Sequence, residues 1–342
     1  MENKFIKLLS TLPPDQKYAC QKYPALIKCL IPQSEIEFKF SKGNGFNYLL
    51  FSLEKPGLLM KPAESRLHVN YLFAKTNEIR VVWSPFFMFS PRSILITGAS
   101  SGLGRALAIS YAGEGVTLCL TGRNEERLLE TVREVERAGG IVLWKALDVC
   151  DAVALQNWVE ELERHTPLDL VISNAGITGS HEVDGAVETA ETAHAQIATN
   201  LGGAVNVLTA VAPFMQQRKS GRIALISSLA GMQPISDGPA YGASKAGVIA
   251  YGEAMRDHLY KWGVSVSVIC PGYILTPMAD QFKSWRPYEY TAEEAASSIK
   301  KAIARKKAFY AFPWQLALSI RIGKLLPWKL RRLANQRFNY QR

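Results

Sequence analysis

The chain has 342 residues, of which 48% are hydrophobic and 20% are charged, and its formal net charge is +10. This composition predicts a globular protein and excludes a chain dominated by low-complexity sequence. The length predicts one domain of about 200–250 residues with additional segments.

The positive charge is concentrated toward the C-terminal end. Residues 300–342 hold 12 lysines and arginines and no acidic residue, whereas residues 93–299 hold 15 basic and 23 acidic residues. A basic segment of this kind favours either a solvated helical face or contact with an anionic surface, such as lipid headgroups or nucleic acid. Because no recognised nucleic-acid-binding motif accompanies it, we expect no nucleic-acid partner.

The five cysteines and the first residues of the chain favour a cytoplasmic location. The number of cysteines is odd and no Cys-x-x-Cys pair occurs, which argues against a disulfide framework and against a zinc site. We therefore expect a reducing compartment and no metal. The first residues lack the pattern of a signal peptide, and no run approaches the roughly 20 apolar residues of a membrane span.

Residues 1–90 predict a small α+β extension whose role the sequence does not identify. Residues 15–31 favour a short helix that ends before Pro32. Alternating apolar and polar residues then predict a hairpin around the Gly-Asn-Gly turn at 43–45. A second hairpin is expected after it, so that the four predicted strands are 36–40, 46–53, 67–73 and 79–83.

Residues 91–300 alternate between apolar strands and amphipathic helices. The expected strands are 94–96, 116–120, 141–146, 169–173, 222–227 and 264–270, and the expected helices are 102–113, 125–138, 152–166, 190–217 and 240–262. This alternation predicts an α/β fold with a doubly wound parallel sheet, the Rossmann fold. Residues 301–342 are then expected to form a basic, apolar tail.

A glycine-rich segment follows the first of these strands. It reads Thr97-Gly98-Ala99-Ser100-Ser101-Gly102-Leu103-Gly104 and leads directly into a helix. Glycines at such a turn let the backbone approach a pyrophosphate, which the free N–H groups at the helix N-terminus then bind. A glycine-rich loop alone is weak evidence, but its position between a strand and a helix predicts a dinucleotide site.

The end of the second strand predicts which dinucleotide is bound. A carboxylate about 20 residues after the glycines usually holds the ribose 2′-hydroxyl of NAD. Here Gly122 takes that place and is followed by Arg123 and Asn124. Because a guanidinium binds a 2′-phosphate bidentately and a carboxylate repels it, the sequence favours NADP(H) over NAD(H). The alternative is that Arg123 is an ordinary surface residue.

Two further strand ends are expected to meet the adenosine part of the cofactor. Asp148 and Val149 end the third strand, and Asn174, Ala175 and Gly176 follow the fourth. Ligands bind at the carboxyl ends of the strands in open α/β sheets, so these residues are expected to share one site.

A tyrosine and a lysine four residues apart predict acid–base chemistry. Tyr241 and Lys245 lie on one face of the expected helix, and Ser228 lies upstream, just past the fifth strand. A nearby ammonium lowers the pKa of a phenol toward the working range, and a serine hydroxyl can bind a substrate carbonyl. The same spacing also occurs by chance on surface helices, so its weight comes from the motifs around it.

In order and spacing, these motifs resemble those of the classical short-chain dehydrogenase/reductase family over about residues 93–300. Ser173 departs from the pattern, because the family has asparagine there. The matching positions are the glycine motif at 97–104, Ser-Asn-Ala-Gly at 173–176, Asn200, the serine motif at 226–231, Tyr241 with Lys245, and Pro271, Gly272, Ile274 and Thr276.

The resemblance implies an oxidoreductase that transfers hydride between a nicotinamide cofactor and a carbonyl or secondary alcohol, and Arg123 favours NADP(H) as that cofactor. It implies that Tyr241 donates the proton, that Ser228 polarises the carbonyl, and that Lys245 binds the nicotinamide ribose and lowers the pKa of Tyr241. It further implies that Asn200 holds a relay water and that Ile274 and Thr276 hold the carboxamide. Family members are commonly dimers or tetramers, which implies a homo-oligomer.

Two segments are expected to line the substrate pocket, 177–195 and 277–292. Their apolar residues favour a hydrophobic substrate, and the alternative is that the same residues pack a lid. These residues are Ile177, Val183, Val187, Met278, Phe282, Trp285 and Tyr288.

The tail combines tryptophan and aliphatic residues with basic ones, which suits a helix on an anionic membrane surface. Packing over the pocket or across a subunit interface is the alternative for the tail.

A second function class is consistent with the same motifs. An NADP-binding regulatory or scaffold protein uses the cofactor as a signal, and residues 1–90 are then the segment that binds its partner.

Overall fold

The chain divides into two compact units, Met1–Met88 and Phe89–Arg342. The computed structural model describes residues 36–43, 46–54, 66–73, 90–179, 187–233, 236, 238–279, 286–327 and 329–330, and in the first unit it describes the backbone.

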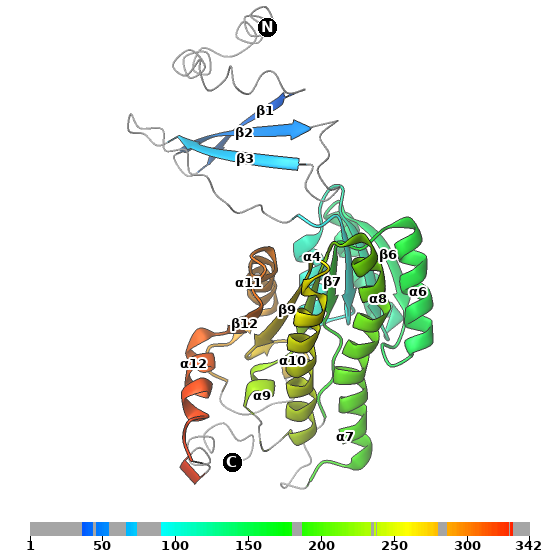
Figure 1. The fold of residues 1–342 in the computed structure, drawn as a ribbon, viewed down its shortest axis with the longest axis vertical. Helices are drawn as coiled ribbons and strands as arrows, with labels where there is room; N and C mark the ends of the chain where they lie inside the picture. The colour runs from blue at the N-terminus through cyan, green and yellow to red at the C-terminus, as the bar shows by residue number, and fades with distance from the viewer. Residues whose placement is uncertain are drawn as a thin grey trace, which may run out of the picture. The chain divides into compact units, whose positions relative to one another are not determined.

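In the first unit, the described residues form an antiparallel sheet of three strands in the order β1-β2-β3 (Figure 1). The strands are β1 (Ile36–Gly43), β2 (Phe46–Glu54) and β3 (Arg66–Phe73). Gly43 pairs with Phe46, as the Gly-Asn-Gly turn predicts. The predicted helix at 15–31 and the predicted strand at 79–83 lie outside the described residues.

The second unit is built on a parallel sheet of seven strands, which confirms the predicted doubly wound α/β fold. The strand order is β12-β9-β8-β7-β4-β5-β6, so the order reverses between β4 and β7. The strands are β4 (Ser93–Thr97), β5 (Thr117–Gly122), β6 (Ile141–Ala146), β7 (Leu170–Ser173), β8 (Gly221–Ile226), β9 (Val264–Pro271) and β12 (Phe309–Phe312). A short parallel pair, β10 (Ile274–Leu275) with β11 (Tyr290–Thr291), lies outside this sheet.

Helices cover both faces of the sheet (Figure 1). One face carries α4 (Gly102–Tyr111), α5 (Glu125–Arg137) and α11 (Ala292–Ala304), and the other carries α6 (Ala152–His165), α8 (Gly203–Arg218) and α10 (Pro239–Tyr260). The remaining helices are α7 (Ala190–Ile197), the π-helix η2 (Ala198–Gly202), α9 (Leu229–Met232) and α12 (Trp314–Gly323).

The apolar strands supply both layers of the core. Successive side chains of a strand point to opposite faces, so Ile94 and Ile96 pack under α4 and α5, while Leu95 between them packs under α6 and α8. All three side chains are fully buried. A sheet covered on both faces therefore needs strands that are apolar throughout, as the sequence predicts.

One helical run of this core is long and apolar enough to cross a membrane by length and composition. Ala190–Arg218, among the described residues, has a mean hydropathy of 1.3 in its most apolar window. Half of that window is buried inside the protein, where α8 packs against α6. The sequence predicts a helix at 190–217 within the same run.

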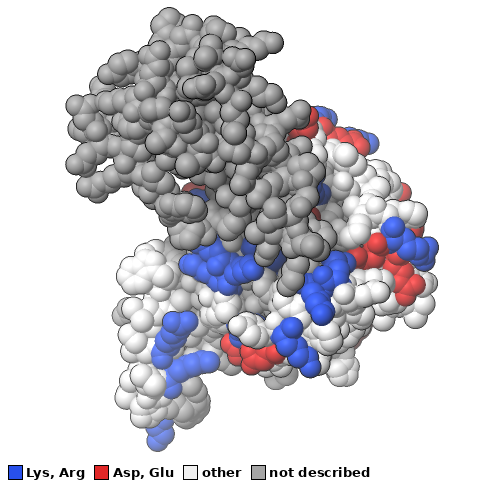
Figure 2. Space-filling model, turned by 45° about the horizontal axis from the view of Figure 1, so that its top comes forward, with Lys and Arg blue, Asp and Glu red and all other residues white. Residues whose placement is uncertain are grey.

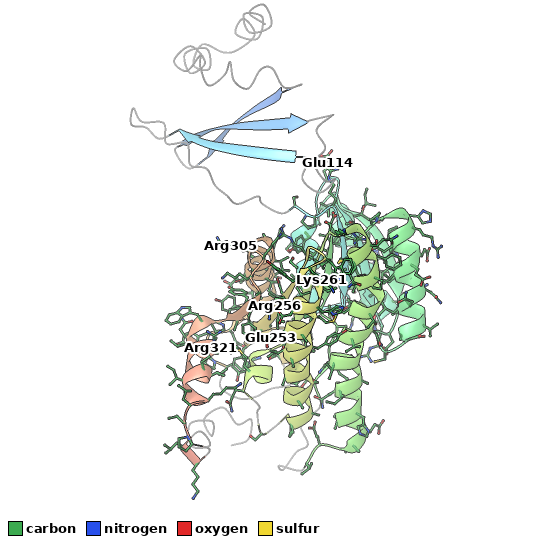
Figure 3. The ribbon with its side chains drawn as sticks, viewed as in Figure 1. Glu114, Glu253, Arg256, Lys261, Arg305 and Arg321 are labelled. Atoms are coloured by element: carbon green, nitrogen blue, oxygen red, sulfur yellow. The ribbon has the colours of Figure 1, made fainter. Side chains whose placement is uncertain are left out.

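The seventh strand comes from the segment that the sequence analysis assigns to a tail. β12 pairs in parallel with β9, with Phe309 opposite Val268. Arg256 of α10 donates a hydrogen bond from Nη1 to the carbonyl oxygen of Ala308, at the start of this strand, at 2.8 Å (Figure 3). The helix α12 that follows packs through Ala317 onto Leu229 and Val268, in a third apolar cluster.

A buried ion pair joins α6 to α8. The carboxylate of Glu163, whose side chain is 3% exposed, accepts hydrogen bonds from Arg218 at 2.5 and 3.2 Å and from the backbone N–H of Leu168 at 3.3 Å.

We predict that Glu163→Ala lowers the free energy of unfolding by about 3 kcal/mol, because it leaves the guanidinium of Arg218 without its anion. Denaturant unfolding measures this, and the exposed neighbour Glu161→Ala is the control. Equal losses in the two variants contradict the prediction.

Candidate active site

A cavity of about 1350 Å³ opens at the carboxyl ends of the parallel strands. Its lining includes Gly98 after β4, Gly122 at the end of β5, Asn174 after β7, Ser227 after β8 and Gly272 after β9. The volume exceeds the roughly 300–1,000 Å³ of a site for one small ligand, so it has room for a dinucleotide and a substrate together. Every residue predicted to hold the cofactor, from Gly98 to Thr276, lines this cavity.

The glycine turn between β4 and α4 is shaped to admit a pyrophosphate. Gly98 has a φ of +67°, and a Cβ there comes within 2.8 Å of the Cα of Ala175. A Cβ on Gly104 comes within 2.1 Å of the Gly98 carbonyl oxygen. As far as the described residues extend, Ser101 makes no side-chain cap on α4 and the first turn holds no acid. The turn thus leaves the helix N-terminus open to the cavity, which fits a bound dinucleotide.

The turn is held in place by the neighbouring strand end. Asn174 donates from its side-chain amide to the carbonyl oxygen of Thr97 at 3.0 Å, and its backbone N–H donates to Thr97 Oγ1 at 3.1 Å. The backbone N–H of Ala175 donates to the same hydroxyl at 3.1 Å. These bonds fix the ends of β4 and β7 to each other at the point where the strand order reverses.

Two arginines lie at the end of the cavity beyond β5. Arg123, whose side chain is 58% exposed, lies 3.8 Å from a carboxylate oxygen of Asp148. Asn124 caps α5 by accepting a hydrogen bond from the N–H of Arg127 at 2.8 Å. Arg127 also lines the cavity and was not predicted, although its place one turn after Arg123 was a usable signal.

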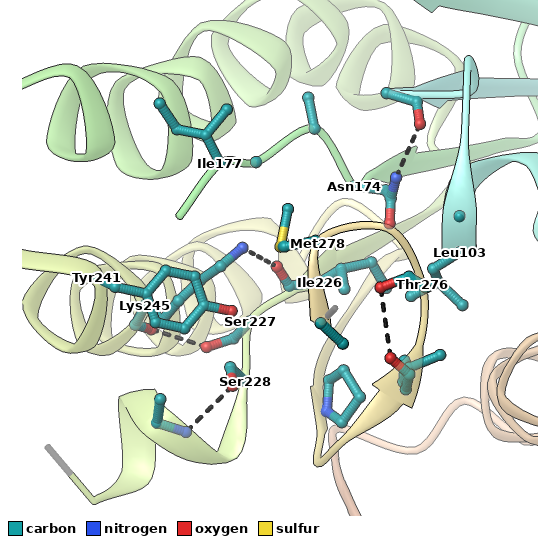
Figure 4. A pocket seen from close by; sticks show the side chains of 18 of the residues that line it. Leu103, Asn174, Ile177, Ile226, Ser227, Ser228, Tyr241, Lys245, Thr276 and Met278 are labelled. Atoms are coloured by element: carbon teal, nitrogen blue, oxygen red, sulfur yellow. Dashed lines mark hydrogen bonds between the residues drawn. The ribbon is translucent and has the colours of Figure 1, made fainter. Parts of the chain in front are cut away.

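Tyr241 and Lys245 project from the first two turns of α10 into the same cavity (Figure 4). The ammonium of Lys245 lies 5.9 Å from the centre of the Tyr241 ring. Ser228, which begins α9, shares a hydrogen bond with the Tyr241 hydroxyl and accepts another from the N–H of Ala230 at 3.1 Å. The structure therefore brings together three side chains that the sequence separates by up to 17 residues.

Lys245 is fixed by the strand end beneath it. Its Nζ donates to the carbonyl oxygen of Ile226 at 3.1 Å, and its own carbonyl oxygen accepts from Ser227 Oγ at 2.7 Å (Figure 4). A Cβ on Gly231 comes within 2.6 Å of the Lys245 carbonyl carbon, so α9 and α10 touch at this point. The lysine is buried, and its ammonium cannot turn away into solvent.

The pKa values of this pair differ from the expectation that Lys245 acidifies Tyr241. Burial raises the pKa of Tyr241 above its ordinary value, and the hydrogen bond with Ser228 only partly opposes it. Burial also lowers the pKa of Lys245 to about 8. The expected lowering of the Tyr241 pKa is therefore wrong for this structure, because desolvation by burial outweighs the hydrogen bond with Ser228. A neutral phenol at neutral pH is a proton donor.

Asn200 lies behind the cavity rather than in its described lining. Its amide nitrogen donates to the carbonyl oxygen of Ile177 and to Ser244 Oγ, both at 2.9 Å, and its oxygen accepts from the N–H of Ile177 at 2.7 Å. It lies in η2, and π-helical turns often mark functional sites. The side chain thus ties the loop after β7 to α10, and the water relay stays a prediction.

The residues predicted to line the substrate pocket agree only in part with the described lining of the cavity. Ile177 and Met278 line it, whereas Val187 and Tyr288 are exposed to solvent. Val183, Phe282 and Trp285 lie outside the described residues. The inner face of α12 contributes residues that were not predicted: Leu316, Ser319, Ile320, Gly323 and Lys324. The alternative in which the tail packs over the pocket therefore describes α12.

Comparison with known proteins identifies the family. The family model for short chain dehydrogenase matches residues 92–287. An uncharacterized oxidoreductase of Myxococcus xanthus is 37% identical over 239 residues, which cover 70% of this chain and 94% of that protein. The ketoacyl reductase HetN of a Nostoc species is also 37% identical, over 222 residues covering 63% of this chain and 76% of HetN.

Two solved structures share the fold and contain different cofactors. A short-chain dehydrogenase from Sphingobium yanoikuyae in complex with NADPH has a TM-score of 0.58 and 25% identity, covering 68% of this chain and 94% of that one. A short-chain dehydrogenase from Mycobacterium paratuberculosis bound to NAD has a TM-score of 0.57 and 27% identity, covering 64% and 94%. The family match, which spans more than half of the sequence, shows that this chain belongs to the short-chain dehydrogenases.

Proposed function

We propose that this chain is an NADPH-dependent carbonyl reductase that acts on an apolar substrate. The observation that carries the proposal is the convergence of Tyr241, Lys245 and Ser228 on the cavity that the glycine turn also lines. A bound nicotinamide supplies hydride to the carbonyl carbon, and the residues of this chain orient both reactants and manage the proton.

Each of the three side chains has one task in this scheme. Tyr241 donates its hydroxyl proton to the carbonyl oxygen as negative charge develops there. Ser228 donates a hydrogen bond to the same oxygen and holds it beside the phenol. Lys245 binds the hydroxyl groups of the nicotinamide ribose, and its positive charge stabilises the phenolate that Tyr241 leaves behind. A tyrosine that keeps its proton at neutral pH suits the direction of reduction.

The preference for NADPH rests on the residues at the end of β5. Gly122 stands where a carboxylate selects NAD, and Arg123 and Arg127 line the adjoining part of the cavity. Two guanidinium groups favour an additional phosphate by charge and by bidentate hydrogen bonding. The ion pair with Asp148 holds Arg123 only weakly at 3.8 Å, which leaves its donors available.

The apolar substrate is supported by apolar residues that line the same cavity as Tyr241. Ile177, Met278, Leu316 and Ile320 line the cavity from three separate elements. Burying an aliphatic chain against such a surface favours binding by about 0.8 kcal/mol for each CH₂ group. The similarity to a ketoacyl reductase agrees with a carbonyl on an acyl chain.

The alternative function uses the same cavity without turnover. The family match begins at residue 92, so the basic first unit lies outside it and is free to serve as a partner-binding segment of an NADP-dependent regulator. The homo-oligomer stays a prediction for either function.

We predict that Tyr241→Phe lowers kcat about 10²- to 10⁴-fold, because the proton donor is lost while the cofactor cavity is kept. The assay follows NADPH oxidation with aldehydes and ketones of graded chain length. Tyr251→Phe, on the same helix and outside the described cavity lining, is the control and retains activity. Full activity of Tyr241→Phe contradicts the mechanism, and an inactive wild type that still binds NADPH favours the regulator.

We predict that kcat/KM for carbonyl reduction is constant below pH 8 and falls as the pH rises through about 8. Lys245, with a lowered pKa of about 8, is charged below that value and neutral above it, so its stabilising charge is lost on the alkaline side. Initial rates on both sides of pH 8 test this. The variant Lys245→Arg keeps its positive charge to far higher pH, so the kcat/KM of any activity that it retains must not fall at about pH 8. A profile that stays flat in the wild type is the contrary result.

We predict that Arg123→Ala raises the KM for NADPH about tenfold and leaves the KM for NADH nearly unchanged. The substitution removes a charge-assisted contact that only the 2′-phosphate makes, and the exposure of Arg123 keeps the effect moderate. Steady-state kinetics with both cofactors measure it. Arg133→Ala, exposed on α5 away from the described cavity lining, is the control. Equal changes with the two cofactors reject Arg123 as the phosphate-binding residue.

A further inference from the structure

The helix α12 has two apolar faces, of which only one is covered by the described residues. Its inner face packs through Ala317 and half-buried Leu316 and Ile320 against the third apolar cluster and lines the cavity. A helix that only closes a pocket needs one apolar face and a polar one opposite. The outer face of α12 does not follow that pattern.

The outer face carries a stripe of large apolar side chains, which we call the outer stripe. It consists of Trp314, Leu318, Ile322 and Leu325, which are 67%, 47%, 56% and 85% exposed. Trp314, Leu318 and Ile322 follow one another at spacings of four residues and lie on one side of α12, opposite Leu316 and Ile320. Leu325 lies in the turn directly after the helix. Three exposed apolar side chains in one row, with a fourth directly after the helix, mark an interaction surface rather than ordinary scatter.

The charged residues that the structure describes on α12 and directly after it are all basic. Arg321 lies one turn from the stripe residues on either side, and Lys324 and Lys329 follow it, all of them exposed. Figure 3 labels Arg321 on α12, and in Figure 2 the described atoms of this lower-left region are blue and white. Residues 300–342 contain 12 basic residues and no acidic one. An apolar stripe with tryptophan and a basic border is the pattern of helices that bind anionic bilayers.

We propose that the outer stripe docks α12 on the surface of an anionic lipid bilayer and places the rim of the cavity against it. Ser319 and Lys324 are exposed and also line the cavity, so the rim lies on α12 itself. A helix lying in the headgroup region buries its stripe, and its inner face then separates the lipid from the bound cofactor. An apolar carbonyl compound dissolved in the bilayer reaches Leu316 and Ile320 without crossing bulk water.

The test measures binding of the full chain to vesicles, so that its outcome is independent of enzymatic turnover. Vesicles of phosphatidylcholine with phosphatidylglycerol are compared with pure phosphatidylcholine in flotation at low and high salt. We expect the wild type to float with the anionic vesicles and to be released by salt. Because the first unit is basic as well, flotation of the wild type alone does not show that α12 binds the vesicles. The deciding protein is the outer-stripe variant, Leu318→Glu with Ile322→Glu.

Leu318→Glu with Ile322→Glu is expected to weaken binding at least about a hundredfold, because it replaces two inserted side chains by anions. Arg321→Gln with Lys329→Gln is expected to weaken binding to anionic vesicles about tenfold or more. Val153→Glu, at an exposed apolar site on α6, is the matched control and binds like the wild type. Thermal unfolding and NADPH binding verify that each variant is folded.

Three results overturn the proposal. The first is that the wild type does not float with the anionic vesicles at low salt. The second is that the outer-stripe variant floats as well as the wild type. In the third, light scattering shows that the wild type is a dimer and that the outer-stripe variant is a monomer, so that a second copy covers the stripe.

Discussion

The close approach of two strand ends is the constraint on which the rest of the site depends. Gly98 at the end of β4 lies so near Ala175 after β7 that no side chain fits between them, and Asn174 bonds the two ends together. The strand order reverses at this place, which opens a crevice between the helices that leave in opposite directions. The backbone of the turn thereby becomes the floor of the cavity.

The catalytic side chains depend on a second close contact, between α9 and α10. Gly231 permits it, and the hydrogen bonds of Ser227 and Ile226 then hold Lys245 in a buried position. Burial keeps the phenol of Tyr241 protonated and makes the lysine easier to deprotonate. A reductase gains from the first effect, because the proton is present when the carbonyl oxygen needs it.

Much of the fold could be predicted because it follows from local patterns. Residues such as Ile94 to Ile96 alternate between two cores, and a strand that is apolar throughout indicates a sheet covered on both sides. The glycine turn and the Tyr241–Lys245 spacing are equally local. The strand β12 was not predicted, because Phe309–Phe312 is a four-residue strand inside a basic segment and its partner β9 lies about forty residues earlier. The cavity-lining role of Leu316 and Ile320 follows from that strand pairing and has no local signal. The pKa of Tyr241 was mispredicted because spacing describes proximity, whereas burial is a property of the folded core.

The late position of β12 and α12 in the sequence has a consequence for synthesis on the ribosome. The glycine turn, Ser228 and the Tyr241 helix all emerge before the strand that completes the sheet edge. Domains begin to fold as they are synthesised, so the nucleotide half of the cavity can organise while its substrate wall is still being translated. A nascent chain at that stage exposes Val268 and Cys270 of β9, which β12 and α12 later cover. The order of translation therefore leaves this edge of the sheet open to a chaperone until β12 has been synthesised.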